Sequence, residues 1–332
     1  MSGMLKRIGI PILIGFVALV SQSCDKSNGA ASTVEQKTLI DSAASSHEVA
    51  TKGTSLSKHH PDFGVWGIAR KSGQMDYVLW ENSAMTKAVQ KGTSNVYTPI
   101  EDAFWLSGYT YNFLAVAPWE SAAGITAITS GTTNGAESLS FSYSLADKYG
   151  AATPDYDFDL MAAVAQTTTG VNHTAAQPLT FWHLFAQICI NVEFVGATGT
   201  VDRMRLYNVD SKADYTIAFD SNKALSVSSQ VSIDASQEKI TFSGLDDGGN
   251  ILHIVPQDIS DITLFLDFTI GQTQTSNFEI NLSNAHNAPN YGYNQKYNWN
   301  IKISPKEISF DVTLSPWVSG GADDEFELEY PN

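Results

Sequence analysis

The sequence has 332 residues, which is more than a single hydrophobic core ordinarily organises, so we expect two domains. Its formal net charge is -16 and it contains no cluster of lysine and arginine that would neutralise phosphate groups, which excludes nucleic acid as a partner. Charged residues make up only 16% of a sequence rich in Ser, Thr, Asn and Gly, a composition typical of an exported β-rich protein.

The N-terminus has the pattern of an export signal. Basic residues at positions 6 and 7 precede an apolar run over residues 8–20, which is too short to span a bilayer as a mature helix. Ser23 stands directly before Cys24, and this pair resembles the lipobox of bacterial lipoproteins, in which the cysteine becomes the acylated N-terminus. We therefore predict a lipoprotein signal peptide over residues 1–23 and lipidation at Cys24; a plain secretory signal is the alternative.

The first half of the exported chain is expected to form a tether and then a sandwich of β-strands. Residues 24–46 are rich in Ser, Ala and Asn without an apolar period, which predicts a flexible tether. Strand-like alternation follows at residues 63–71, 75–82, 109–119 and 138–145. These strands predict an N-terminal β-sandwich domain over residues 47–180.

The stretch FWHLFAQICINVEFV (181–195) is long enough to serve two sheets in succession, because strands usually have about 5–6 residues. Its even positions are all apolar, and a period of two predicts a β-strand. We expect its first half to pair with the N-terminal sandwich and its second half with the C-terminal one, with the boundary near residues 176–188. Cys189 lies in this strand and is predicted to be buried as a small apolar side chain.

Short alternating stretches continue through the second half of the chain. They lie at residues 203–209, 215–219, 225–233, 239–245, 251–257, 261–270, 297–303 and 308–317, with Gly-, Asp- or Pro-containing turns between them. Such a series predicts an all-β fold of packed antiparallel sheets and a C-terminal β-sandwich domain over residues 181–332.

The last segment, EFELEY (325–330), has the alternation of a strand and follows a Gly- and Asp-rich linker. Phe326, Leu328 and Tyr330 share one face, and glutamates occupy the other. Such a strand either closes its own sheet or enters a sheet of another chain, and both alternatives stay open.

Candidate metal sites are weak in this sequence. Asp155, Asp157 and Asp159 begin a calcium-loop pattern, but Leu160 replaces the required glycine, so we predict a solvated acidic run. The adjacent His59 and His60 point to opposite sides of an extended chain, so we interpret them as part of a surface loop. No metal or other cofactor is predicted.

No catalytic signature for nucleophilic, metal-dependent or nucleotide-dependent chemistry is present, so we predict that the protein is not an enzyme. His183 is interpreted as a half-buried histidine that is hydrogen-bonded to backbone. Trp105 and Trp119 lie near loop ends, where exposed rings would stack on sugars. They keep open an alternative function as a surface glycan-binding lipoprotein of a nutrient-uptake system.

Several stretches together resemble the fimbrillin family, the major and minor fimbrial subunit lipoproteins (pilins) of Gram-negative anaerobes. Each stretch is a loose pattern, and the resemblance rests on their number and order along nearly the whole mature chain. The matching stretches are the lipobox at Cys24, ATKGTS (50–55), WLSGYTYNFLAVAPW (105–119), DFDLMAA (157–163), PLTFWHLFAQICINVEF (178–194), NYGYNQKYNWNIKI (290–303) and Trp317-Val318-Ser319-Gly320.

The resemblance implies two tandem transthyretin-like antiparallel β-sandwich domains. It also implies a lipid anchor in the outer membrane, surface display, and assembly with other pilus subunits in a fimbrium that adheres to host or bacterial surfaces. In polymerising members a protease removes an N-terminal strand, and a C-terminal strand of a neighbouring subunit fills the groove. Lys52 and Lys58 are the basic residues at which such processing would occur here; an anchor or accessory subunit that keeps its lipid is the other alternative.

Overall fold

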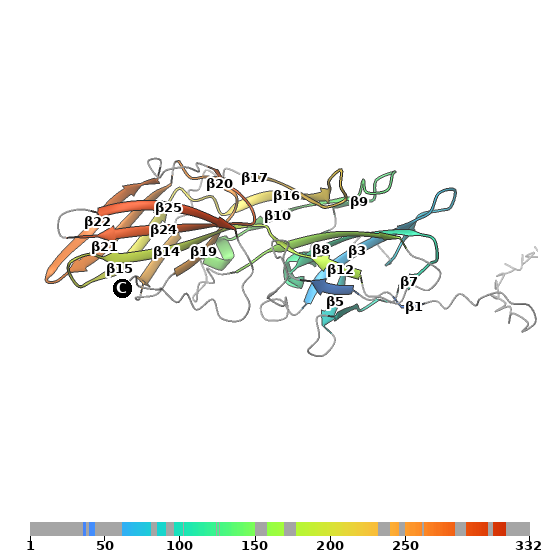
Figure 1. Cartoon of the computed structure of the whole chain (residues 1–332), viewed down its shortest axis with the longest axis horizontal. Coiled ribbons are helices and arrows are strands. Elements are labelled where there is room, and N and C mark those ends of the chain that lie inside the picture. Colours follow the sequence, from blue (N-terminus) through green and yellow to red (C-terminus); the bar gives the residue numbers. More distant parts are fainter. Residues whose placement is uncertain are drawn as a thin grey trace, which may run out of the picture. The chain divides into compact units, whose positions relative to one another are not determined.

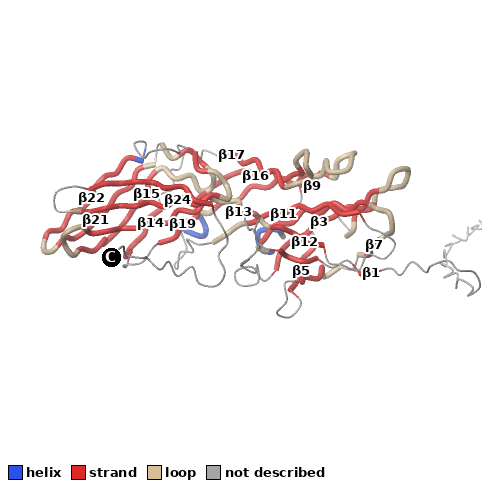
Figure 2. Tube along the Cα trace, viewed as in Figure 1, coloured by secondary structure: helices blue, strands red, loops and turns tan. Residues whose placement is uncertain are grey.

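The chain consists almost entirely of β-strands in the residues that the structure describes (Figures 1 and 2). The structure is a computed structural model. The described residues are 36–37, 40–43, 62–80, 85–90, 96–101, 103–123, 125, 127–149, 158–168, 177–231, 240–245, 250–260, 262–282, 290–304 and 308–316. They contain strands β1 to β25 in several mostly antiparallel sheets, which confirms the predicted all-β class.

Helices are few and short in these residues. The two described helices, α1 (Trp119–Ala122) and α2 (Ala146–Tyr149), have four residues each. Neither of them is long and apolar enough to cross a membrane.

The largest sheet, called here the nine-stranded sheet, is built around two strands that are buried on both faces. In β3, Phe63 and Val65 enter one core, and Trp66 and Ile68 enter another. A strand that is covered on both sides has a nearly continuous apolar sequence, as β3 and its neighbour β8 do. The strand order is β12 (Gln177–Thr180), β2 (Ile40–Ala43), β6 (Val96–Pro99), β5 (Thr86–Gln90), β3 (Asp62–Arg70), β8 (Thr110–Ala117), β11 (Met161–Thr168) and β13 (Trp182–His183), with β4 (Tyr77–Val78) paired to β3.

Residues 36–37 and 40–43, within the segment predicted as a tether, are paired in sheets. β1 (Gln36–Lys37) pairs with β7 (Phe104–Trp105), and β2 lies between β12 and β6 in the nine-stranded sheet. A strand as short as β2 needs no apolar period of its own, because its backbone groups are satisfied by the neighbours on either side. The pairing of β2 with β12 is parallel, whereas most strand pairs of the fold are antiparallel.

A second sheet, called here the β16 sheet, packs against the nine-stranded sheet. It is ordered β17 (Leu225–Val231), β16 (Lys212–Phe219), β10 (Ser138–Ser144) and β9 (Ala127–Thr129). Leu139, Tyr215 and Ile217 from this sheet share a core with Trp66 and Leu114. Residues 212–231 lie in the range predicted for the C-terminal domain, yet they pair with β10 from the range predicted for the N-terminal domain. The division into domains 47–180 and 181–332 stays a prediction.

Two further four-stranded sheets enclose a separate core. The β14 sheet is ordered β19 (Asn250–Ile254), β14 (Ala186–Phe194), β24 (Gln295–Ile303) and β25 (Ile308–Pro316), and the β15 sheet is ordered β18 (Ile240–Leu245), β15 (Gly199–Tyr207), β21 (Thr263–Ile270) and β22 (Thr273–Asn281). Ile188 and Trp299 from the first sheet pack with Leu264 and Leu266 from the second. A short pair, β20 (Gln257–Asp258) and β23 (Asn290–Tyr291), adds Tyr291 to this core.

The stretch 181–195 changes partners along its length, as expected from its length. β13 pairs with β11 in the nine-stranded sheet, whereas β14 pairs with β19 and β24 in the β14 sheet. It is not one continuous strand, however. Leu184 and Phe185 interrupt it, both fully buried, and the Leu184 amide donates to the Leu160 carbonyl at 2.7 Å.

Candidate functional site

Three hairpin turns are held together at one end of the nine-stranded and β16 sheets. The turns cover residues 71–76 after β3, 130–137 between β9 and β10, and 220–224 between β16 and β17, and we call them the hairpin-tip cluster (Figure 1). Turns at the ends of a rigid sheet are the part of a β-sandwich most often used for binding. The contacts among these turns therefore define the candidate site.

Arg70 is the centre of the hairpin-tip cluster. It ends β3 on the same face as Trp66 and Ile68, so its side chain enters the space between the two sheets, where the residue is 7% exposed. Its Nε donates to Oε1 of Glu137 at 2.8 Å, and Glu137 is fully buried. Its Nη1 also binds the Asp76 carboxylate, which fixes the first turn.

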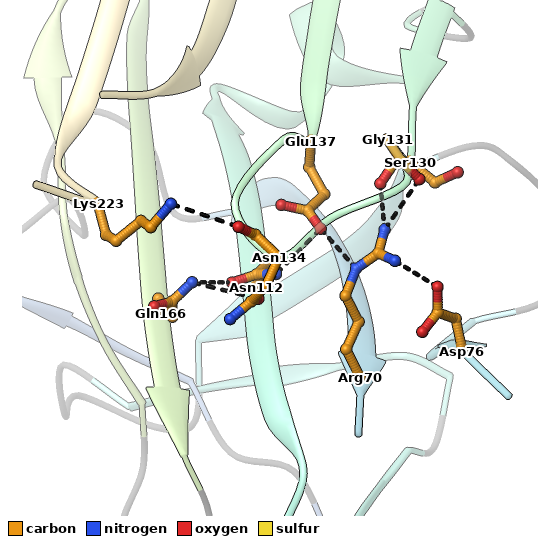
Figure 3. Close-up of polar contacts among 9 residues, drawn as sticks. All are labelled: Arg70, Asp76, Asn112, Ser130, Gly131, Asn134, Glu137, Gln166 and Lys223. Carbon is orange, nitrogen blue, oxygen red and sulfur yellow. Dashed lines mark hydrogen bonds and ion pairs between the residues drawn. The ribbon is translucent and has the colours of Figure 1, made fainter. Parts of the chain in front are cut away.

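The same guanidinium holds the second turn through backbone oxygens. Nη2 of Arg70 donates to the carbonyls of Ser130 and Gly131, the latter at 3.2 Å (Figure 3). Five N–H groups in one plane allow a single arginine to bind two carboxylates and two carbonyls at once. One buried side chain therefore joins residues 70, 76, 130, 131 and 137.

A layer of amide side chains continues the polar contacts away from Arg70. Asn112 in β8 is fully buried and lies opposite Gln166 in β11, so both amides face the second turn. The Asn112 Nδ2 donates to Glu137 Oε1 at 3.0 Å and to Asn134 Oδ1 at 2.6 Å, and the Gln166 Nε2 donates to Asn112 Oδ1 at 2.6 Å (Figure 3). Lys223 Nζ completes the set by donating to the Asn134 carbonyl at 3.3 Å, which attaches the third turn.

The second turn depends on glycine. Gly131 has a φ of 63°, and a Cβ atom built on it would lie 2.6 Å from the Ala136 carbonyl oxygen. A side chain there would meet the returning chain as well as an unfavourable backbone conformation. Gly131 thus lets the turn fold back tightly while its own carbonyl faces Arg70.

This arrangement suits positioning rather than bond chemistry. Arg70 pairs with two carboxylates, and the amides donate within the network. A layer of side chains that are hydrogen-bonded to one another fixes the turns in one conformation. The side chains that point outward from the turns are therefore presented on a rigid support.

The family of the chain follows from a comparison of the sequence with family models. A model described as fimbrillin-like matches residues 49–317, which is most of the chain. The chain belongs to the fimbrillin-like family. A search of curated proteins found no match.

Solved structures share the fold of this fimbrillin-like chain. A fimbrial protein from Bacteroides vulgatus has a TM-score of 0.56 and 17% sequence identity, with 85% of this chain and 99% of that chain covered. A Bacteroides uniformis protein named for cell adhesion has a TM-score of 0.54 and 15% identity, with 85% and 98% covered. A similarly named protein from Bacteroides ovatus has a TM-score of 0.54 and 12% identity, with 86% and 98% covered. At these identities the likeness is one of fold.

The candidate site residues predicted from the sequence lie outside the described part of the chain. They are Cys24, Lys52, Lys58, Phe326, Leu328 and Tyr330, and Asp155, Asp157, His59 and His60 lie there too. Cys189 is described, and it is 2% exposed in the middle of β14, which confirms its predicted burial. Cys189 lies in β14 and is not part of the hairpin-tip cluster.

Two interpretations of polar residues need correction. Asp159 is not solvated: its side chain is 13% exposed and its Oδ2 lies 2.6 Å from Nδ1 of His183. His183 itself is 4% exposed and contacts this carboxylate, so it is neither half-buried nor held by backbone alone. The reason is that Asp159 precedes β11, whose partner β13 carries His183. Among the described residues, no group of three or more His, Cys, Asp or Glu is placed to hold a metal.

The tryptophans proposed as sugar platforms are packed into the protein. Trp105 is 6% exposed and stacks edge-on against Tyr111 and Phe113, and Trp119 is partly buried beside the core between the nine-stranded and β16 sheets. Neither ring is available as an open platform. This finding removes the observation that supported the nutrient-uptake alternative.

The hairpin-tip cluster was not predicted from the sequence. One signal was available, because Arg70 has the parity of Trp66 and Ile68, and a cation on the buried face of a strand requires a partner. Glu137 carries no such signal, since it lies in a Gly- and Thr-rich turn far along the chain.

Proposed function

We propose that this fimbrillin-like chain is a non-enzymatic subunit of a surface fimbrium that acts in adhesion and assembles by exchange of a β-strand. The family match over residues 49–317 carries this proposal. A lipid at Cys24 would anchor the unprocessed subunit in the outer membrane. The sequence features on which assembly would depend are the lysines at 52 and 58 and the terminal segment 325–330.

The position of β2 supports strand exchange. β2 pairs with β12 over residues 40–43 and with β6 over residues 40–41, so it fills the space between two strands that do not pair with each other. Lys52 and Lys58 lie between β2 and β3 in the sequence. Cleavage at either lysine would allow β2 to leave and would expose the backbone groups of β12 and β6 to a new strand.

The terminal segment 325–330 has the pattern of a strand that could replace β2. It follows β25 after a Gly-rich linker, and its three apolar side chains share one face. Apolar side chains on one face would enter the groove while the glutamates stay in water. A donor of this pattern satisfies both the backbone and the apolar side of the vacated position.

The proposal is tested by changing one face of the terminal segment at a time. The triple variant F326S/L328S/Y330S is expected to abolish multimers and filaments after protease treatment, because the donor loses its apolar anchors. The matched variant E325S/E327S/E329S keeps those anchors and is expected to assemble. Electron microscopy and gel filtration measure the outcome, and filaments formed equally by both variants would show that this strand is not the donor.

A further inference from the structure

The first turn of the hairpin-tip cluster presents an unusual set of exposed side chains. Met75 is 78% exposed, Tyr77 47% and Val78 45%, and these are among the most exposed large apolar side chains described. Tyr109 directly precedes β8, and the centre of its ring lies 5.9 Å from that of Tyr77, with an angle of 60° between the ring planes. Arg70 binds Asp76, which lies between Met75 and Tyr77, so the network holds the hairpin that carries Met75, Tyr77 and Val78.

A cation lies on this aromatic pair. Lys71 Nζ is 5.3 Å from the centre of the Tyr109 ring and 3.5 Å from the Ser107 carbonyl oxygen. Loss of hydration and the neighbouring Tyr77 raise the pKa of Tyr109 above its ordinary value. The Tyr109 hydroxyl therefore stays neutral at physiological pH, and the Lys71 ammonium is the cation beside it.

The Lys71 ammonium is held by a carbonyl oxygen and a ring. Among the described residues, Lys87 pairs with Asp62 and Lys302 with Glu193, whereas Lys71 contacts the Ser107 carbonyl and the Tyr109 ring. The nearby carboxylates of the cluster are already engaged, because Arg70 binds Asp76 and Glu137. The Lys71 ammonium can therefore bind an external anion, in a chain with a net charge of -16.

We propose that Tyr77, Tyr109 and Lys71 form a binding site for an acidic glycan. The apolar face of a sugar ring packs on the tyrosine rings, and a carboxylate or sulfate on the sugar binds the Lys71 ammonium group.

The chemistry of the surface favours a glycan over a protein partner. Loops rich in Tyr, Ser, Gly and Asn are typical of binding surfaces that use a few rigid aromatic anchors among adaptable polar groups. A stable protein interface buries about 800 Å² on each partner around an apolar centre, which the few exposed apolar side chains of this one hairpin do not supply. This inference deepens the proposed adhesive function by naming the ligand class, and its site is separate from the strands used in assembly.

The test measures binding of the full chain to immobilised heparin, hyaluronan and neutral dextran. We expect binding to heparin and hyaluronan, weakening with salt, and none to dextran. K71Q and Y77S should each weaken binding about tenfold, which corresponds to loss of one charged or stacking contact. K302Q removes an equal charge elsewhere, and Y207S removes a partly exposed tyrosine from β15; both should bind as the unaltered chain does.

Several outcomes would overturn the inference. Equal binding to dextran would show that binding does not depend on an acidic group of the sugar. Equal affinities of K71Q and K302Q would show only general charge attraction. A change in self-association of Y77S by sedimentation, without glycan binding by the unaltered chain, makes the surface a contact between copies. Filament formation by K71Q and Y77S is measured in parallel: glycan binding without filaments contradicts the proposed assembly alone, and filaments without glycan binding contradict this inference alone.

Discussion

The pair of Arg70 and Glu137 decides how rigid the hairpin-tip cluster is. Both side chains are almost fully removed from water, where an ion pair gains little over a hydrophobic pair of similar volume. Loss of one partner is a different matter, because the remaining charge stays buried without compensation. The Arg70 guanidinium also holds two backbone carbonyls, so its removal exposes several unsatisfied groups at once.

We predict that R70M lowers the free energy of unfolding by about 3–5 kcal/mol, since it leaves Glu137 charged and buried. K87M is the control, because Lys87 in β5 and Asp62 in β3 form a partly exposed ion pair, and we expect about 0–1 kcal/mol. Urea unfolding at neutral pH measures both variants. Similar losses in the two variants would mean that burial of the Arg70 pair adds nothing.

Single residues show where sequence patterns stop being informative. Cys189 is buried as predicted, although it lies on the same face of β14 as Gln187 and not on the all-apolar face; the first five residues of β14 are buried on both faces. His183 and Asp159 were placed wrongly because their contact joins two strands 24 residues apart through sheet pairing. The pattern of residues within one segment does not show which other segment it pairs with.

At the level of elements, the second turn of the hairpin-tip cluster joins the two sheets that enclose the core around Trp66. Its conformation is set by Gly131 and its attachment by Arg70, so turn geometry and packing are coupled. A change in the turn should therefore be felt as strongly as a change in the ion pair.

We predict that G131A destabilises the fold by more than the left-handed backbone alone would cause. Gly271 provides the control, because its φ of 60° matches the 63° of Gly131 but no atom lies within 4 Å of an added Cβ. G271A should cost about 1 kcal/mol, and G131A about 2–3 kcal/mol because of its added contact with the Ala136 carbonyl. Thermal unfolding compares the two variants, and equal losses would show that the close approach is relieved without cost.

The elements that could be predicted are those with one covered face or a strong apolar run. The expected strands at 138–145, 203–209 and 297–303 all appear within a few residues of their predicted ends. β11 was missed because MAAVAQTT is alanine-rich and lacks alternation, and β22 because most of its side chains are exposed. Alternation reveals a strand only when one face is apolar and the other is polar.

At the level of the whole molecule, β2 was not predicted from the sequence, yet the proposed assembly depends on its position. β2 has four residues and lies between β12, more than 130 residues away in sequence, and β6. No local pattern predicts that place, since it is set by which backbone edges remain open after the longer strands have paired. With only four residues, β2 gives up few backbone hydrogen bonds when a longer strand replaces it.

The N-terminal mass of the protein on cells connects this position with assembly. We expect an acylated Cys24 in the unassembled membrane fraction and a start at Gly53 or His59 in the assembled fraction, because cleavage after Lys52 or Lys58 releases β2. The double variant K52Q/K58Q should keep the lipid and stay unassembled. K37Q, which changes a lysine ahead of β2, should be processed normally. Mass spectrometry of both fractions decides between the alternatives: an acylated Cys24 within filaments means that the chain is incorporated with β2 in place, and the terminal segment must then pair elsewhere.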